Sequence, residues 1–305
     1  MAFNQGCRGL VPQATLDTRY FRYQLSAIAD RLAASGQGST FDELSGDALA
    51  ASKVIVPDLA EQRAIADYLD IETARVDAVL ANKRRMLDLL NERVDAEIKE
   101  WIGGSELAKG GSGARPAPIG RLLTKLRRRA LVAEMVTAYR DGQVTARSLR
   151  RAEGYTDAWT GAAQLQGVAR DDVVVHGLDA FSGAVGWSEV DGVCSPINHV
   201  CVPADGGHPL FYARMLRVLA TSGYLGLFAT STRERAVDLR NWDLFGRIPI
   251  PVVPAAEQHR IGERIRALVP LKVAVDRSAS LAAEHREALI TAAVTGELDV
   301  PGVAA

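Results

Sequence analysis

This chain of 305 residues has few cysteines, almost no net charge and no long apolar runs. The three cysteines, Cys7, Cys194 and Cys201, form no set of paired spacings, so we expect reduced thiols in the cytoplasm rather than a disulfide framework. Lys plus Arg number 36 against 37 for Asp plus Glu, so any claim of nucleic-acid binding must rest on local charge. We see neither a signal peptide at the start nor an apolar run approaching the roughly 18 residues that span a membrane.

Motifs of catalysis are also missing. No Gly-x-x-x-x-Gly-Lys phosphate loop is present, and no Asn-Pro-Pro-aromatic stretch of an adenine methyltransferase. Cys194 and Cys201 with His199 make a poor zinc site, so core thiols are expected. His176 and Asp179 could belong to a hydrolase, but no nucleophile motif surrounds them, and a structural role in a strand and its following turn is favoured.

A repeat is the most informative feature that the sequence does contain. Glu61-Gln62 and Ile65 match Glu257-Gln258 and Ile261 at one common offset. Similar offsets align "YFRYQL" with "LFYARML" upstream, and "AEIKEWIGGSEL" with "EALITAAVTGEL" downstream. "KVIVP" and "RIPIP" are read as matching short strands before each helix. An ordered series of matches predicts duplicated domains, with one whole unit at about 108–298 and one at 1–107 that lacks its N-terminal half.

Two long helices are expected, at 61–102 and 256–295, because apolar residues recur there at alternating spacings of three and four. Asp58 and Glu61 predict a capping box at the first, and Pro270 should kink or split the second. An antiparallel coiled coil would bury both apolar stripes; the alternative is that each helix packs on its own globular domain. The packing positions predicted are Ile65, Leu69, Val76, Val79, Leu87, Leu90, Val94, Ile98, Ile261, Ile265, Leu268 and Leu289.

Between the helices, the composition predicts an α+β globular domain. "DVVVHGL" (172–178) and "NHVCVP" (198–203) are typical of strands. "FYARMLRVLATSGYL" (211–225) indicates a helix that Gly223 ends, and 234–245 a weaker helix or turn.

These segments resemble the specificity subunits of type I restriction–modification systems. The resemblance rests on "VIVPDLAEQRAIADYLDIETARVDAVLANKRRMLDLLNER", "VTAYRDGQVTARSLRRAEGY", "GVARDDVVVHGLDAFSGAVGWSEVDGVCSPINHVCVP" and "IPIPVVPAAEQHRI", and it extends over essentially the whole chain. It implies target recognition domains separated by two antiparallel spacer helices. The expected parts are a truncated first recognition domain (1–57), the central spacer helix (58–104), a linker (105–118), a complete recognition domain (119–253), the distal spacer helix (254–297) and a tail (298–305).

Local charge supports DNA contact by the complete domain. Ten basic residues stand against two acidic ones over 115–151, whereas 58–107 holds seven basic against twelve acidic. Such a local excess neutralises phosphates, and Arg or Gln side chains in a tight Asp141-Gly142 turn could read base edges. The DNA-binding residues predicted are Lys125, Arg127, Arg128, Arg129, Arg140, Gln143, Arg147, Arg150, Arg151, Arg233, Arg235 and Arg240.

The resemblance implies a noncatalytic subunit that directs adenine methylation and DNA cleavage by its partners. Those partners are double-stranded DNA, modification subunits and an ATP-dependent restriction subunit. S-adenosylmethionine, ATP and Mg belong to the partners, and no cofactor or metal is expected in this chain. The alternative is an interaction-only or vestigial subunit, or one that must form a homodimer to read a bipartite target.

Overall fold

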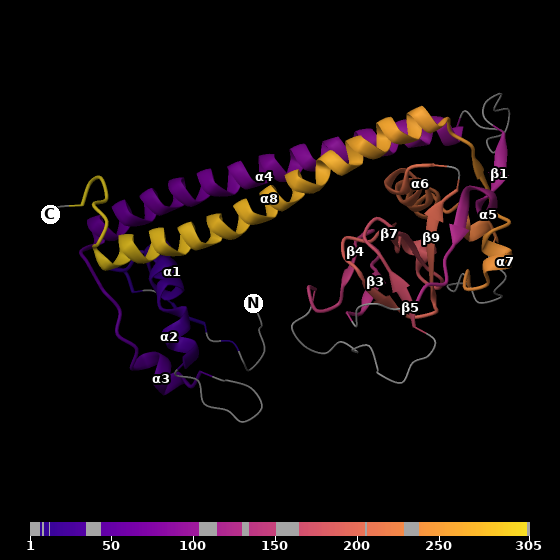
Figure 1. The fold of residues 1–305 in the computed structure, drawn as a ribbon. Coiled ribbons are helices and arrows are strands. Elements are labelled where there is room, and N and C mark those ends of the chain that lie inside the picture. Colours follow the sequence, from indigo (N-terminus) through magenta and orange to yellow (C-terminus); the bar gives the residue numbers. More distant parts are fainter. Residues whose placement is uncertain are drawn as a thin grey trace. The chain divides into compact units, whose positions relative to one another are not determined.

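The computed structural model describes residues 7, 9–11, 13–34, 44–103, 115–129, 134–150, 165–204, 206–228 and 238–303. The chain divides into two compact units, one made of Met1–Met86 with Lys272–Ala305 and the other of Leu87–Leu271. Two long helices, α4 (Leu59–Gly103) and α8 (Ala255–Thr295), contribute to both units (Figure 1). Among the described helices, none has an apolar stretch that would cross a bilayer.

Among the described residues, the first unit has three short helices before α4, namely α1 (Thr18–Ala27), α2 (Ala29–Ala34) and α3 (Gly46–Ala50). Of these, α1 packs onto the start of α4 and the end of α8. The Asp17 side chain caps α1 by accepting from the backbone N–H groups of Arg19 and Tyr20, as short polar side chains do at helix starts. The core of this unit holds Tyr20, Tyr23, Ile65, Ala66, Leu69, Ile290, Ala293, Val294 and Val300.

Within each unit, α4 and α8 lie side by side in opposite directions. In the first unit the start of α4 packs against the end of α8, and Lys83 Nζ donates to Ser278 Oγ over 2.7 Å. In the second unit Val94 and Ile98, near the end of α4, share a core with Ile261 and Ile265, near the start of α8. Helices that contact by opposite ends are antiparallel. The expectation of an α+β fold with a long spacer helix is confirmed.

The α4 helix begins as the sequence predicts, because Asp58 Oδ1 accepts from the Glu61 backbone N–H over 2.9 Å. Its apolar stripe differs in one position: Val79 is 53 % exposed, while Leu80 beside it is half-buried and continues the buried face. Consecutive helical residues point about 100° apart, so the two cannot share a face. The other predicted packing positions are buried at Ile65, Leu69, Val94, Ile98, Ile261 and Ile265 and half-buried at Val76, Leu87, Leu90, Leu268 and Leu289.

Pro270 lies inside α8 without splitting it, contrary to one outcome expected from the sequence. Proline cannot donate to the carbonyl four residues earlier and crowds that turn. That carbonyl belongs to Arg266, an exposed residue, so water can satisfy the group that proline leaves without a donor. The helix therefore continues through the proline to Thr295.

Over its described residues, the second unit holds one four-stranded sheet and three two-stranded ones, all antiparallel. The large sheet has the order β2 (Leu123–Lys125), β9 (Asn198–Pro203), β6 (Val173–His176), β7 (Val185–Trp187). The small pairs are β1 (Pro116–Pro118) with β10 (Pro249–Pro251), β3 (Val136–Ala138) with β4 (Val144–Ala146), and β5 (Gln166–Val168) with β8 (Gly192–Cys194). Strands are thus present where 172–178 and 198–203 predicted them.

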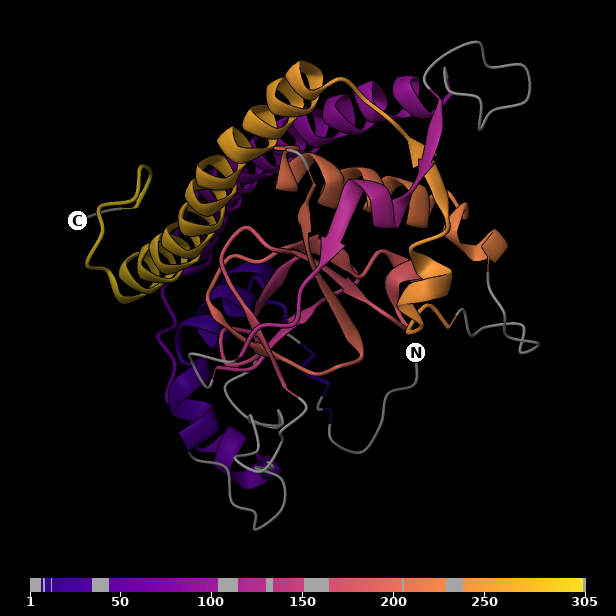
Figure 2. The same cartoon turned by 45° about the vertical axis from the view of Figure 1, so that its right-hand side comes forward.

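Strand β6 separates two apolar cores, because successive side chains of a strand point to opposite faces. Val173 and Val175 join the core that contains helix α6 (Pro209–Thr221), while Val174 faces the core under β3 and β4. Figure 2 shows α6 between the strands and the long helices. Short elements complete the unit: α5 (Ile119–Leu122), α7 (Trp242–Phe245) and the 3₁₀ turns η1 (Ala180–Ser182) and η2 (Leu225–Phe228).

The repeated Glu-Gln pair has a structural explanation in its glutamine. Gln62 is buried, donates to Pro57 O over 2.8 Å and accepts from the Asp17 N–H over 2.8 Å. Gln258 is also buried, donates to Val253 O over 2.7 Å and accepts from the His208 N–H over 3.2 Å. Asp17 and His208 are the residues that begin α1 and α6. Each copy therefore uses its glutamine to tie a helix start to the long helix.

The two copies differ at the segment before that glutamine. In the second unit Pro249–Pro251 pair with Pro116–Pro118, so the end of the expected 105–118 linker is strand β1. The matching segment of the first unit, 53–57, was read as a strand from its composition, but it forms none. Among the residues described in that unit, no segment pairs with it, and a lone extended segment has no ladder of hydrogen bonds.

Candidate functional site

The hairpin of β3 and β4 presents a three-residue loop, Arg140-Asp141-Gly142. The Tyr139 N–H donates to Gln143 O over 2.8 Å, and the Gly142 N–H donates to Tyr139 O over 2.9 Å. Gly142 has a φ of 87°, the left-handed value that closes such a loop and that glycine adopts without strain. The tight turn that Asp141-Gly142 predicted is present, and it exposes the side chains of Arg140 and Asp141.

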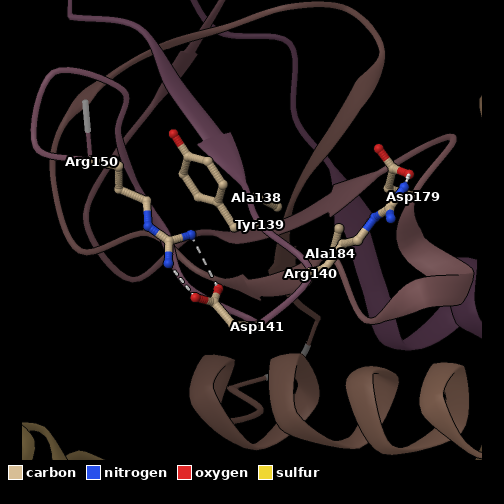
Figure 3. A pocket seen from close by; sticks show the side chains of 7 residues that line it. All are labelled: Ala138, Tyr139, Arg140, Asp141, Arg150, Asp179 and Ala184. Atoms are coloured by element: carbon tan, nitrogen blue, oxygen red, sulfur yellow. Dashed lines mark hydrogen bonds and ion pairs between the residues drawn. The ribbon is translucent and has the colours of Figure 1, made fainter. Parts of the chain in front are cut away.

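A hollow of about 440 Å³ opens beside this loop, with an ion pair on each of its two sides (Figure 3). On one side Arg140 Nη2 lies 2.8 Å from Asp179 Oδ1. On the other side Arg150 pairs with Asp141, and its guanidinium carbon lies 4.2 Å from the centre of the Tyr139 ring. Both arginines were predicted to contact DNA, and each is held by a carboxylate.

Two further predicted side chains also contact carboxylates. Gln143 Nε2 donates to Glu189 Oε2 over 2.9 Å. Arg128 Nη1 lies 2.9 Å from Asp172, whose side chain is only 4 % exposed. Burial raises the pKa of Asp172 even though Arg128 and the Ala169 N–H favour its charged form. Arg128 thus compensates a buried charge, which indicates a structural role.

The remaining predicted residues are spread over the unit. Lys125 is half-buried in β2 with its Nζ 5.7 Å from the centre of the Trp242 ring, and burial lowers its pKa. Arg127 and Arg129 are exposed just after that strand, and Arg147 is half-buried after β4. Arg240 forms a bidentate pair with Asp238, and that pairing lowers the pKa of Asp238 to about 2. Three predicted positions lie outside the described residues: Arg151, Arg233 and Arg235.

Arg217 is a candidate that the sequence did not single out. It lies on α6, and its side chain occupies the space where a side chain of Gly142 would stand. Its Nε is buried and has no hydrogen-bond partner among the described residues. Burial, followed by repulsion from Arg214, lowers its pKa. The sequence predicts only that Arg217 belongs to a largely apolar helix. Nothing in the sequence indicates that its charge lies under the hairpin.

His176, His199 and the two cysteines of this unit have structural surroundings. His199 Nε2 lies 2.7 Å from Leu239 O, and burial lowers the pKa of this histidine to about 4. His176 Nδ1 accepts from the Asp179 N–H over 3.0 Å. Cys194 and Cys201 are buried, and burial raises both thiol pKa values, that of Cys194 to about 12. Over the described part of the chain, no group of three or more His, Cys, Asp or Glu side chains could hold a metal ion.

Comparison with protein families finds one match, over residues 1–83, to the type I restriction modification DNA specificity domain. The match lies in the first copy of the repeat and extends into α4. It confirms the resemblance that the sequence predicted, while the truncation of the first domain stays a prediction.

Comparison with solved structures finds matches whose titles name type I restriction–modification systems or their S subunits. A structure on the complex assembly and conformational transition of the type I R-M system matches with a TM-score of 0.60 and 14 % identity over 93 % of this chain and 72 % of that one. The HsdS subunit of Thermoanaerobacter tengcongensis matches with 0.47 and 15 % over 93 % and 71 %. A type I S subunit from M. genitalium matches with 0.45 and 17 % over 92 % and 73 %. At these identities the first of them shows a shared fold.

Proposed function

Because residues 1–83 carry a type I restriction modification DNA specificity domain and the fold matches a type I system, we propose that this chain is the DNA-specificity subunit of a type I restriction–modification complex. It selects the sequence at which partner subunits methylate adenine and cleave DNA. The family match is the observation that carries the proposal, and the geometry of the second unit supports it.

The second unit offers side chains suited to reading base pairs. Arg140, Gln143 and Arg150 lie in or beside one hairpin loop, and the side chains of Arg140 and Asp141 at that loop are exposed. Arginine can donate two hydrogen bonds to guanine, and glutamine can pair with adenine in the major groove. A two-stranded β-ribbon is narrow enough to enter that groove. We therefore assign base reading to this loop.

Phosphate contacts fall to other basic residues of the same unit. Arg127 and Arg129 are exposed on the segment after β2, where their charges face solvent. Contacts to phosphates set the position of a protein on the duplex and do not depend on sequence. Replacing either residue by glutamine should weaken binding to every DNA sequence alike and lower the salt dependence by about one charge.

The chemistry is assigned to partners. Modification subunits supply S-adenosylmethionine and the methyl transfer, and an ATP-dependent restriction subunit with Mg supplies cleavage. In this proposal the chain itself is noncatalytic, and its paired long helices hold its units for those partners. Replacing both His176 and Asp179 by alanine should therefore leave methyl transfer by a folded complex in place.

Selection from random DNA tests the proposal. The chain is purified with its modification subunits, mixed with duplexes of random sequence, and the retained DNA is sequenced. We expect one recurring sequence to be enriched. An intact complex that enriches no sequence would contradict the proposal and favour an interaction-only subunit.

A further inference from the structure

Charges of both signs meet at the hollow beside the β3–β4 loop. Arg140 and Arg150 contribute two positive charges, and Asp179 and Asp141 contribute two negative ones. The two carboxylates come from different parts of the unit, since Asp141 lies in the loop itself and Asp179 precedes η1. The arginines that the proposed function needs are therefore neutralised before any DNA arrives.

Both ion pairs can exchange one partner for another at little cost in free energy. The Arg140 and Asp179 side chains are 70 % and 36 % exposed, and those of Arg150 and Asp141 are 32 % and 52 % exposed. Ion pairs at such exposure contribute little to stability, because water screens them and two side chains must be held in place. An incoming acceptor group of DNA can replace a carboxylate there without unfolding any element.

Arg217 adds a third positive charge near the loop, although it does not line the hollow. Its Nε lies under Gly142, is buried and has no acceptor among the described residues. The negative charges of Asp95 and Asp141 favour the charged form of this arginine. The loop thus has three arginines around it, and Asp141 interacts with two of them, Arg150 and Arg217.

We propose that Asp141 and Asp179 act as guard carboxylates, which occupy Arg150 and Arg140 in the absence of target DNA and give way to the base edges of the target when the complex engages it. This inference rests on the proposed function and adds residues that set specificity. The guard carboxylates repel the phosphates of any DNA. A duplex therefore displaces them only when it also makes the base contacts. Their role is to weaken binding to non-target DNA more than binding to the target.

The test measures affinity for two duplexes as a function of salt, using the complex of the full chain with its modification subunits. One duplex carries the sequence enriched from random DNA, and the other has an arbitrary sequence. Asp179→Asn and Asp141→Asn keep side-chain size, and asparagine at 141 still accepts from the Gln143 N–H, which lies 3.1 Å from Asp141 Oδ1. We expect each variant to bind the arbitrary duplex several-fold more tightly, with a salt slope steeper by about 0.9. Its preference for the enriched sequence should fall.

Two controls separate a guard from a general loss of negative charge. Asp171→Asn removes a carboxylate of the same unit that pairs with Arg266 over 3.1 Å at similar exposure but does not line the hollow. It should change the affinity for the arbitrary duplex less than either guard variant does. Asp179→Asn should also give no gain when Arg140→Gln is already present, because the released charge is then missing.

Equal gains for Asp171→Asn and the guard variants, or a full gain in the Arg140→Gln background, would overturn the guard role. So would guard variants that bind both duplexes as the unmodified chain does. These results leave the proposed function standing, because enrichment of one sequence by the unmodified complex is measured separately. Failure of that enrichment would count against the proposed function instead.

Discussion

Gly142 is the residue on which the shape of the candidate reading loop depends. Its φ of 87° is strained for any residue with a side chain, and a methyl group there would also meet the Arg217 guanidinium. We expect Gly142→Ala to destabilise the protein by about 1–3 kcal/mol. It should also weaken binding to the enriched sequence, because the loop can no longer hold Arg140 and Gln143 in place.

Thermal unfolding and DNA affinity of the same preparation check that prediction. Gly46→Ala is the matched control, since Gly46 starts α3 with open space around it and no left-handed backbone. The control should leave both quantities unchanged or raise stability slightly. If Gly142→Ala unfolds and binds like the control, the loop is not held in the shape described.

His199 makes stability depend on pH. Burial lowers its pKa to about 4, and its Nδ1 has no partner in the described part of the chain. The unfolded histidine titrates near 6.5, so below that pH the unfolded chain gains a proton that the folded chain does not. Stability should thus be full above pH 6.5 and fall progressively toward pH 4, by about 2 kcal/mol between pH 7 and pH 5.

Unfolding at pH 7 and pH 5 measures this loss. In His199→Gln the amide nitrogen stands where Nε2 was and can still donate to Leu239 O, but it does not titrate, so this part of the pH dependence should disappear. His285→Gln, at an exposed position of α8, should retain it. Equal pH dependence in all three proteins would mean that burial of His199 does not set its protonation.

At the scale of elements, the buried glutamines explain why two helix starts have the same local sequence. Gln258→Ala would leave Val253 O and the His208 N–H buried without partners, and Gln62→Ala would remove the partner of Pro57 O and of the Asp17 N–H, which are half-buried. Each unsatisfied group costs about 1–3 kcal/mol. We expect each variant to lose about 2–4 kcal/mol of unfolding free energy.

Denaturant unfolding checks this, with Gln13→Ala as the control because Gln13 is exposed. A loss at Gln258 without a loss at Gln62 would show that the repeated glutamines are not equivalent. A loss at neither would mean that water or a shifted backbone replaces both hydrogen bonds.

Sequence periodicity predicted the elements well where the signal was local. The caps, the apolar spacing and the valine-rich segments placed α4, β6 and β9 within a few residues. The effect of Pro270 was harder to predict from the sequence, because whether a proline splits a helix depends on what surrounds the carbonyl that it leaves without a donor. The structure of the segment 53–57 was harder still to predict, because a strand needs a partner strand, and composition does not reveal one.

At the scale of the whole molecule, charge along the chain proved a poor guide to charge in space. The stretch 115–151 holds ten basic and two acidic residues, yet Asp172, Asp179 and Glu189 fold back onto Arg128, Arg140 and Gln143. Those carboxylates lie about 40 residues away along the chain. Only the antiparallel sheet brings them together, so the sequence could name the arginines but not their partners.

The map of methylated adenines tests the central claim most directly, namely that this chain chooses the DNA sequence through its β3–β4 loop. DNA is methylated by the complex with the unmodified chain and, in parallel, with the chain carrying both Arg140→Ala and Gln143→Ala. We predict that the unmodified complex methylates adenines in one recurring sequence and that the variant tolerates other bases at some of its positions. A map without a recurring sequence, or the same sequence and the same stringency in both maps, would contradict the account.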